Sequence, residues 1–136
     1  MQTIIFPAQF SSLAFIADAV SQAARAAELT DRAAYAIQLA VDEACSNIIE
    51  HGYAGRTDGQ IEFHSEKLED GLQIVLRDQG VPFDPTQAPE TDFSVPLEKL
   101  HLRGAGLVMM QQALDDLSFR ILPGGINELT LIKRAG

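Results

Sequence analysis

The sequence predicts an α+β domain, built as a two-layer sandwich of helices on a mixed, mostly antiparallel sheet. Three observations predict it. Apolar residues recur at helical spacing across residues 11–52. They recur at every second position in later segments, which glycine-containing turns join in pairs. At 136 residues the chain is long enough for one core and too short for two, so we expect a single domain over residues 1–136.

The first elements are a short strand and a helix. Residues 3–6 read as the strand, which Pro7 ends. Ser11 or Ser12 can cap the helix, which then runs to Leu29 with its apolar residues at helical spacing. The chain therefore enters the helical layer within its first dozen residues.

A second helix follows directly. Thr30 caps it, and Asp31 in its first turn places a negative charge where the helix dipole favours one. We expect it to end near Gly52, a residue type that readily takes a left-handed conformation. Its core-facing stripe consists of Ile37, Val41, Ala44, Cys45 and Ile48. Glu43 and Asn47 fall about 100° of rotation from the centre of that stripe, where a polar group can be held firmly yet face a cleft.

The rest of the chain reads as two hairpins separated by a loop and a helix. Alternating apolar residues run from 61 to 78 around a tight turn at residues 69–71, which indicates a hairpin. Residues 81–102 hold four prolines and scattered acids, which mark a long loop of a kind that is usually functional or mobile. The remaining elements are a helix from about 105 to 114 and strands near 117–122 and 128–133.

Composition limits the function. Hydrophobic residues make up 46% of the chain, which excludes a largely disordered protein, and no apolar run approaches the ~20 residues that cross a bilayer. The amino terminus lacks the features of a signal peptide, so we expect a cytoplasmic protein without membrane contact. The formal net charge of −9 argues against general nucleic-acid binding, because phosphate contacts need clustered lysine and arginine. Cys45, the one cysteine, fits a buried packing residue better than a reactive thiol.

A polar stripe on the second helix is the first candidate for chemistry. Glu43, Asn47 and His51 recur at every fourth position, which stacks a carboxylate, an amide and an imidazole along one face. A carboxylate can accept a proton, an amide oxygen is a hard ligand suited to magnesium, and an imidazole can orient either neighbour. Taken alone, a solvated helix face explains the same pattern, with His51 fixing the helix end.

The second candidate begins at Asp78, the end of an expected strand. Its carboxylate can accept a hydrogen bond from the exocyclic amine of adenine, and Gly80 lets a flat ligand approach the backbone. Val81, Pro82 and Phe83 can supply apolar walls. The alternative for this segment is an ordinary Asp-x-Gly turn after a strand.

The third candidate is Gly104-Ala105-Gly106, which opens a helix. Unsatisfied backbone N–H groups at a helix start form an anion site for phosphates, and Arg103 can add a charge-assisted contact. The alternative is a hinge between loop and helix, since a lone Gly-x-Gly is weak evidence. It is not a Walker P-loop, because no Gly-Lys-Ser/Thr follows. Together the three candidates indicate a magnesium–nucleotide site.

The order and spacing of these segments resemble the anti-sigma-factor serine/threonine kinases of the GHKL ATPase superfamily, which have the Bergerat ATP-binding fold. Residues 41–53, VDEACSNIIEHGY, look like the N-box of that family. Residues 78–85, DQGVPFDP, look like its G1 box, and their Pro-Phe-Asp-Pro ending is more specific to this branch than Asp-x-Gly is. Residues 104–107, GAGL, look like the G2 box, and residues 127–133, NELTLIK, resemble the last strand. The resemblance covers nearly the whole chain.

The resemblance assigns roles to individual residues. It implies that Asn47 binds magnesium, that Glu43 is the catalytic carboxylate that activates the attacking hydroxyl, and that His51 supports the site. It implies that Asp78 binds the adenine amine and that residues 81–103 form the ATP lid. The other nucleotide-binding positions would be Gly80, Pro82, Phe83, Arg103, Gly104, Ala105, Gly106, Leu107 and Thr130.

The same resemblance implies a function. The chain would be a protein-serine kinase that uses ATP and Mg²⁺, phosphorylates an anti-anti-sigma protein with a STAS domain, and sequesters a sigma factor, as a homodimer. It would regulate transcription without touching nucleic acid. The alternative is a catalytically weak or inactive nucleotide-binding module that acts only by binding proteins, with ATP or ADP selecting its conformation. Glu43 favours the kinase, whereas Ala105, at a position that is often basic, and a lid with few cations favour the module.

Overall fold

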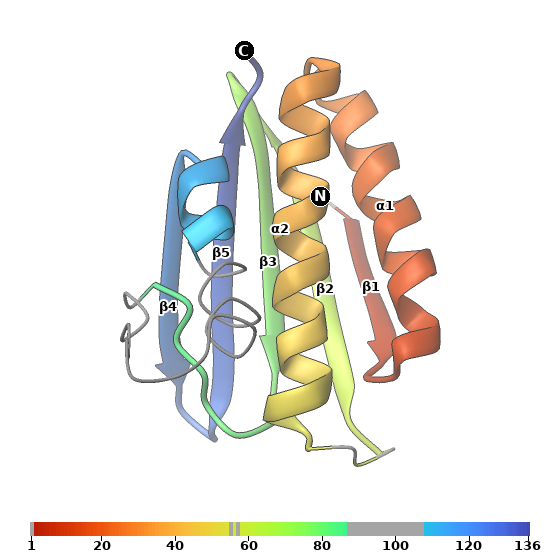
Figure 1. Cartoon of the computed structure of the whole chain (residues 1–136), viewed down its shortest axis with the longest axis vertical. Coiled ribbons are helices and arrows are strands. Elements are labelled where there is room, and N and C mark those ends of the chain that lie inside the picture. The colour runs from red at the N-terminus through yellow and green to blue at the C-terminus, as the bar shows by residue number, and fades with distance from the viewer. Residues whose placement is uncertain (1, 55, 57, 87–107) are drawn as a thin grey trace, which may run out of the picture.

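The computed structural model describes residues 2–54, 56, 58–86 and 108–136. Two helices lie against one face of a five-stranded sheet (Figure 1). In chain order the elements are β1 (Gln2–Pro7), η1 (Phe10–Ser12), α1 (Leu13–Ala26), α2 (Asp31–Asn47), η2 (Ile48–Gly52), β2 (Gln60–Leu68), β3 (Gly71–Asp78), β4 (Asp116–Leu122) and β5 (Ile126–Arg134). Residues 108–113 are also helical. The predicted two-layer α+β class is confirmed.

The sheet has the strand order β1-β2-β3-β5-β4. Each neighbouring pair is antiparallel, so the described strands contain no parallel pair, where a mixed sheet was expected. Both predicted hairpins are present, β2 with β3 and β4 with β5. Gly124 and Gly125 have φ angles of 89° and 74°, the left-handed conformations on which the turn between β4 and β5 depends.

The two helices begin differently. Thr30 caps α2 as predicted, because its hydroxyl oxygen accepts a hydrogen bond at 3.1 Å from the backbone N–H three residues later. The predicted side-chain cap on α1 is wrong. Ser12 already has helical φ and ψ of −78° and −18°, since η1 leads directly into α1, and its side chain makes no capping bond. α1 ends at Ala26 rather than Leu29, and the left-handed backbone of Glu28 (φ 59°) turns the chain toward α2.

The carboxyl end of α2 departs from α-helical geometry. Its continuation, η2, is a π-turn closed by the Tyr53 N–H, which donates to the Ile48 carbonyl at 2.9 Å. Gly52 lies inside this turn and is not left-handed, contrary to expectation, and Ala54 takes that conformation instead (φ 51°). The Val81 N–H donates to the Gly52 carbonyl at 2.7 Å, so the widened turn contacts the segment after β3. Such π-turns are frequent at functional sites.

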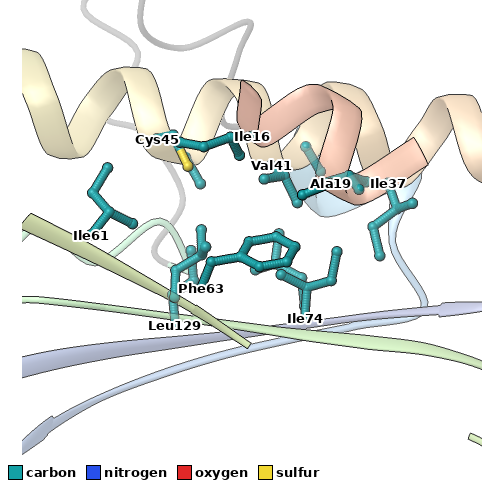
Figure 2. Packing of buried hydrophobic residues seen from close by; sticks show 14 of the residues in the cluster. Ile16, Ala19, Ile37, Val41, Cys45, Ile61, Phe63, Ile74 and Leu129 are labelled. Carbon is teal, nitrogen blue, oxygen red and sulfur yellow. The ribbon is translucent and has the colours of Figure 1, made fainter. Parts of the chain in front are cut away.

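The core lies between the helices and the sheet. Figure 2 shows side chains of both layers packed together: Ile16 and Ala19 from α1, Ile37, Val41 and Cys45 from α2, and Ile61, Phe63, Ile74 and Leu129 from the strands. The strands contribute alternate residues, as the period of a strand dictates. The predicted stripe of α2 is confirmed, with Ile48 packed at the edge of the cluster. Among the described residues, no helix has the length and hydropathy to cross a membrane.

Candidate functional site

A pocket lies where the end of α2 meets the ends of β3 and β5. Its lining consists of Ala44, Asn47, Ile48, Gly52, Asp78, Val81, Phe83, Pro85, Phe119, Asn127 and Leu129. The polar stripe of α2 and the Asp-x-Gly segment after β3, singled out separately in the sequence, therefore meet at one place. The cavity measures about 30 Å³, which holds a water molecule or two.

Asp78 is the buried acid of this pocket. It is 8% exposed, and its Oδ1 accepts hydrogen bonds from the Gly80 N–H at 2.9 Å and from Asn127 Nδ2 at 3.1 Å. Burial raises the pKa of the Asp78 carboxyl above its ordinary value, against the lowering effect of these two hydrogen bonds. Its Oδ2 bonds to none of the residues that the structure describes. Asp78 thus offers one fixed oxygen and one oxygen that can accept a donor.

Asn127 is a site residue that the sequence analysis missed. It is 3% exposed, and its Nδ2 donates to Asp78 Oδ1 and also to the Gly80 carbonyl at 2.8 Å. These two acceptors fix which way the amide points, and they leave its Oδ1 buried without a partner among the described residues. The sequence did hold a signal for Asn127. It stands two and four residues before Leu129 and Leu131, so on a strand it shares their buried face, where a polar side chain is unusual.

Thr130, in contrast, does not lie at the pocket. Consecutive strand residues point to opposite faces of a sheet, and Leu129 faces the helices. Thr130 therefore faces the other side, where its neighbours across the strands are Val75 and Ser118. The expectation for Thr130 is corrected: Asn127 is the polar residue of β5 that lines the pocket.

Gly80 holds the end of β3 against the end of α2. A Cβ atom at this position would lie 2.5 Å from the carbonyl carbon of Gly52 and 2.6 Å from its oxygen, closer than a Cβ approaches backbone atoms. The hydrogen bond from the Val81 N–H to the same carbonyl lies beside this contact. Gly80 was expected to let a flat ligand approach, and here the space of its missing side chain is taken by the Gly52 backbone.

The polar stripe of α2 has one member in the lining. Asn47 lines the pocket, whereas Glu43 lies one turn earlier and His51 lies further along, in η2. Glu43 and Asn47 are half-exposed, and neither side chain bonds to a residue that the structure describes. Mg²⁺ takes one or two such oxygen ligands together with waters and substrate phosphates, so this donor set fits it. In the described ranges, no three His, Cys, Asp or Glu side chains cluster as a metal cage.

An aromatic stack supports one wall of the pocket. The ring of Phe83, a lining residue, stacks on the ring of His51 with centroids 6.1 Å apart and planes 29° apart. Pro82 was expected in the same wall, but it is exposed and outside the lining. Pro85 is the buried proline that lines the pocket instead, and its carbonyl accepts a hydrogen bond from Gln111 Nε2 at 2.9 Å. The segment after β3 is therefore tied both to η2 and to the helical residues 108–113.

The third segment of the sequence lies outside the described residues. This applies to Arg103, Gly104, Ala105, Gly106 and Leu107, and to the expected lid (81–103) apart from residues 81–86. The geometry above therefore concerns only the first two of the three segments.

Cys45 is a packing residue, as predicted. Its side chain is fully buried in α2 within the core cluster. Burial above all, with the nearby charges of Asp42 and Asp78, raises the pKa of its thiol. A thiol held in the neutral form and away from solvent is unreactive.

The histidine kinase-like ATPase domain matches the chain over residues 6–133. Serine-protein kinase RsbW of Bacillus cereus (strain AH187) is 34% identical over 85 residues, 60% of this chain and 52% of that protein. RsbW of Bacillus pumilus is 31% identical over 94 residues, 65% of this chain and 58% of that protein. The chain thus spans little more than half the length of these relatives.

Solved structures share the fold at low sequence identity. The RsbU and RsbW domains of a Mycobacterium tuberculosis protein superpose with a TM-score of 0.63 at 14% identity, covering 98% of this chain and 32% of that one. The histidine kinase domain of a blue-light-activated kinase from Erythrobacter litoralis gives 0.56 at 18% identity, covering 96% and 62%. The match over residues 6–133, together with this shared fold, shows that the chain belongs to the histidine kinase-like ATPase domain family.

Proposed function

We propose that the chain is an ATP-dependent anti-sigma factor, a protein-serine kinase that phosphorylates an anti-anti-sigma protein with a STAS domain and also sequesters a sigma factor. One observation carries the proposal: Asn47 and Asp78, which retains a carboxylate oxygen able to accept a donor, line the same pocket. Identity of 31–34% to RsbW serine-protein kinases, within an ATPase family, supports the reaction class.

The pocket lining supports recognition of adenine. Ile48, Phe83 and Leu129 provide apolar surface for the base. Asp78 Oδ2 accepts a hydrogen bond from the exocyclic amine of adenine, while Asn127 and the Gly80 N–H hold Oδ1. Guanine carries a carbonyl oxygen where adenine carries that amine, so it would bring two acceptors together. The proposed site therefore prefers ATP to GTP.

Glu43 and Asn47 act on the phosphate side in this proposal. Bound Mg²⁺ neutralises charge on the phosphates, and the amide oxygen of Asn47 would be its protein ligand. Glu43 accepts the proton of the substrate serine hydroxyl as that oxygen forms its bond to the γ-phosphorus. The bond from the γ-phosphorus to the bridging oxygen breaks, and ADP leaves with that electron pair. We expect the backbone of residues 103–107 beside the phosphates, under the lid.

The partners in this proposal come from the family resemblance. They are a sigma factor and a STAS-domain protein, bound by a cytoplasmic homodimer. A net charge of −9 supports contact with proteins rather than with nucleic acid, because phosphate backbones repel an acidic surface.

A second candidate is a nucleotide-binding module without kinase activity. Ala105 favours it, because the corresponding position of the family is often basic and a cation there would clamp the phosphates. Such a module would bind ATP or ADP through the same pocket and change only its affinity for a partner.

The test is phosphoryl transfer from ATP labelled at the γ-phosphate to STAS-domain proteins of the same organism. Glu43→Gln removes the proton acceptor and keeps the shape of the side chain. We expect roughly 100-fold slower transfer, with ATP affinity within about threefold in calorimetry. Binding of ATP without transfer by the unmodified chain would establish the second candidate. Absence of ATP binding by folded protein would refute both.

A further inference from the structure

Tyr53 follows η2 directly, and its side chain has no role in the function proposed above. Its backbone N–H closes the π-turn on the Ile48 carbonyl. The residue is buried, with 4% of its surface exposed, and its hydroxyl reaches the ends of two strands. The end of α2, the start of β2 and the end of β3 lie at the same end of the molecule (Figure 1). Tyr53 therefore connects the helical layer to the sheet beside the pocket.

The hydroxyl of Tyr53 bridges β2 and the segment after β3. The Gln79 N–H donates to Tyr53 Oη at 2.9 Å, and Oη donates to the Gln60 carbonyl at 2.7 Å. Both directions are fixed, because a backbone N–H can only donate and a carbonyl can only accept. The last pair of β2 and β3 at this end is Glu62 with Arg77, and the same register continued would bring Gln60 opposite Gln79. The hydroxyl therefore links the two chain segments at a position where their own pairing has stopped.

The end of β3 is held unequally along its two edges. On the β5 side the pairing continues to the last residue of β3, Asp78, which lies opposite Asn127. On the β2 side the pairing ends at Arg77. A hollow of about 330 Å³, with Tyr53, Asp78 and Gln79 in its lining, leaves this segment room to shift. Among the described residues, the Tyr53 hydroxyl is the group that bonds to the backbone next to Asp78 on the β2 side.

The ring of Tyr53 is itself fixed by its surroundings. A Cβ atom on Gly59 would lie 2.6 Å from two ring carbons of Tyr53, so the ring occupies the space that a side chain at position 59 would need. The Gly59 backbone is in turn tied to the end of β1, because its carbonyl accepts a hydrogen bond from the Ala8 N–H at 2.9 Å. A rigid ring packed in this way determines where its hydroxyl lies.

We infer that Tyr53 is a positioning residue of the nucleotide site, whose hydroxyl holds the backbone at Gln79 and so sets where Asp78 presents Oδ2 to the amine of the base. The inference rests on the adenine recognition of the proposed function. A hydrogen bond to a carboxylate depends on distance and direction, whereas apolar contact with a flat base does not. A small shift of Asp78 therefore weakens ligands that carry the amine and spares those that lack it. A merely structural tyrosine would affect all nucleotides alike.

The test compares ATP with purine riboside triphosphate, which carries a hydrogen where adenine carries its amine. In calorimetry we expect the unmodified chain to bind ATP about tenfold more tightly than this analogue. Tyr53→Phe keeps the ring and removes the hydroxyl, so ATP should bind more weakly and its advantage should fall to about twofold. Affinity for the analogue should stay within about twofold of that of the unmodified chain, because the apolar lining is unchanged.

Two further variants complete the experiment. Tyr35→Phe removes the same atom from an exposed tyrosine of α2 and should leave both affinities unchanged. Gly59→Ala displaces the Tyr53 ring by its Cβ and should lower the preference for ATP by a second route. It also serves as the test if Tyr53→Phe does not fold, which circular dichroism verifies.

The outcomes separate this inference from the proposed function. An unchanged preference for ATP in the folded variants, whether both affinities stay or fall together, refutes the positioning role and leaves the proposed function standing. An unmodified, folded chain that binds both ligands equally, or neither, refutes the adenine recognition and this inference together. Phosphoryl transfer does not enter the measurement, so loss of kinase activity alone would not produce either result.

Discussion

At the residue scale, the buried pair of Asp78 and Asn127 determines what the pocket can recognise. A buried carboxylate needs donors, and Asn127 supplies one without adding a charge to a site that already holds an acid. The amide also bonds to the Gly80 carbonyl, so it fixes the carboxylate relative to the backbone after β3. Specificity for the base therefore depends on two side chains from strands that are adjacent in space and 49 residues apart in sequence.

Asp78→Asn should reverse the preference for the base. The variant amide keeps an oxygen for the Gly80 N–H and presents its NH₂ group where Oδ2 was, which repels the amine of adenine and suits the carbonyl of guanine. We expect ATP to bind tenfold or more weakly, about 1.4 kcal/mol, and GTP to bind as well or better. Calorimetric titration with both nucleotides measures this. Equal losses for ATP and GTP would contradict the role of Asp78 in reading the base.

Asn127→Ala and Thr130→Ala form a matched pair on one strand. Loss of the Asn127 amide leaves the Gly80 carbonyl and Asp78 Oδ1 short of a donor, which should cost about 1–3 kcal/mol of unfolding free energy and weaken ATP binding about tenfold. Thr130 faces the opposite side of the sheet, so its variant should bind ATP within about twofold of the unmodified chain. Urea unfolding and titration check both. Weaker ATP binding by Thr130→Ala would show that Thr130 contributes to the nucleotide site after all.

At the scale of elements, the junction of β3 with α2 and η2 builds the pocket. α2 carries the polar stripe, and its π-turn brings the Gly52 carbonyl within 2.7 Å of the Val81 N–H. Gly80 lets the two backbones meet. A helix that ended in an ordinary α-turn would present that carbonyl elsewhere, because a π-turn is wider. The junction therefore links the metal-binding side chain of the proposal, Asn47, to the adenine-binding one, Asp78.

Gly80→Ala should open this junction. The added Cβ meets backbone atoms of Gly52 at 2.5–2.6 Å, and backbone cannot rotate away as a side chain can. We expect a loss of about 2–4 kcal/mol in unfolding free energy, and weaker ATP binding in the folded fraction. Gln79→Ala, one residue earlier and exposed, is the control and should change stability by less than about 0.5 kcal/mol. A similar small change in both variants, measured in urea, would show that the junction relaxes without cost.

At the scale of the whole molecule, the two faces of the sheet differ in what they contact. One face packs on the helices and supplies the core and the pocket. On the other face, Glu128 is buried between Arg77 and Arg120, with 6% of its side chain exposed. Burial acts to raise the pKa of Glu128, but the hydrogen bonds and charges of the two arginines outweigh it, and the pKa lies below the ordinary 4.5.

Glu128→Gln should lower stability at neutral pH and not in acid. Because the folded pKa of Glu128 is depressed, its carboxylate contributes stability above the unfolded pKa, and this contribution is lost as the pH falls through the folded pKa. We expect a deficit of about 1–2 kcal/mol at pH 7 that shrinks below pH 4.5. Urea unfolding of dilute protein at several pH values measures it, with exposed Glu66→Gln as the control. A deficit that does not change with pH would assign the effect to packing.

Much of the molecule was predictable from local patterns. The helical period of α2, its Thr30 cap and the alternation of both hairpins depend on neighbours in sequence, so the two-layer class followed from them. The N-box and Asp-x-Gly segments were also visible, because each is continuous in the chain. Family membership over residues 6–133 agrees with the resemblance drawn from those motifs.

The tertiary structure alone decided how these segments meet. Asn127 lines the pocket and Thr130 does not, because consecutive residues of a strand point to opposite faces of the sheet. Which of the two faces carries the pocket depends on the side that the helices cover. Gly80 contacts Gly52 because α2 continues into a π-turn, and no pattern of residues in the sequence predicted that turn. The two arginines that flank Glu128 depend on the register of β3, β5 and β4. Local propensity determines elements, whereas faces, registers and junctions are fixed only when distant segments pack together.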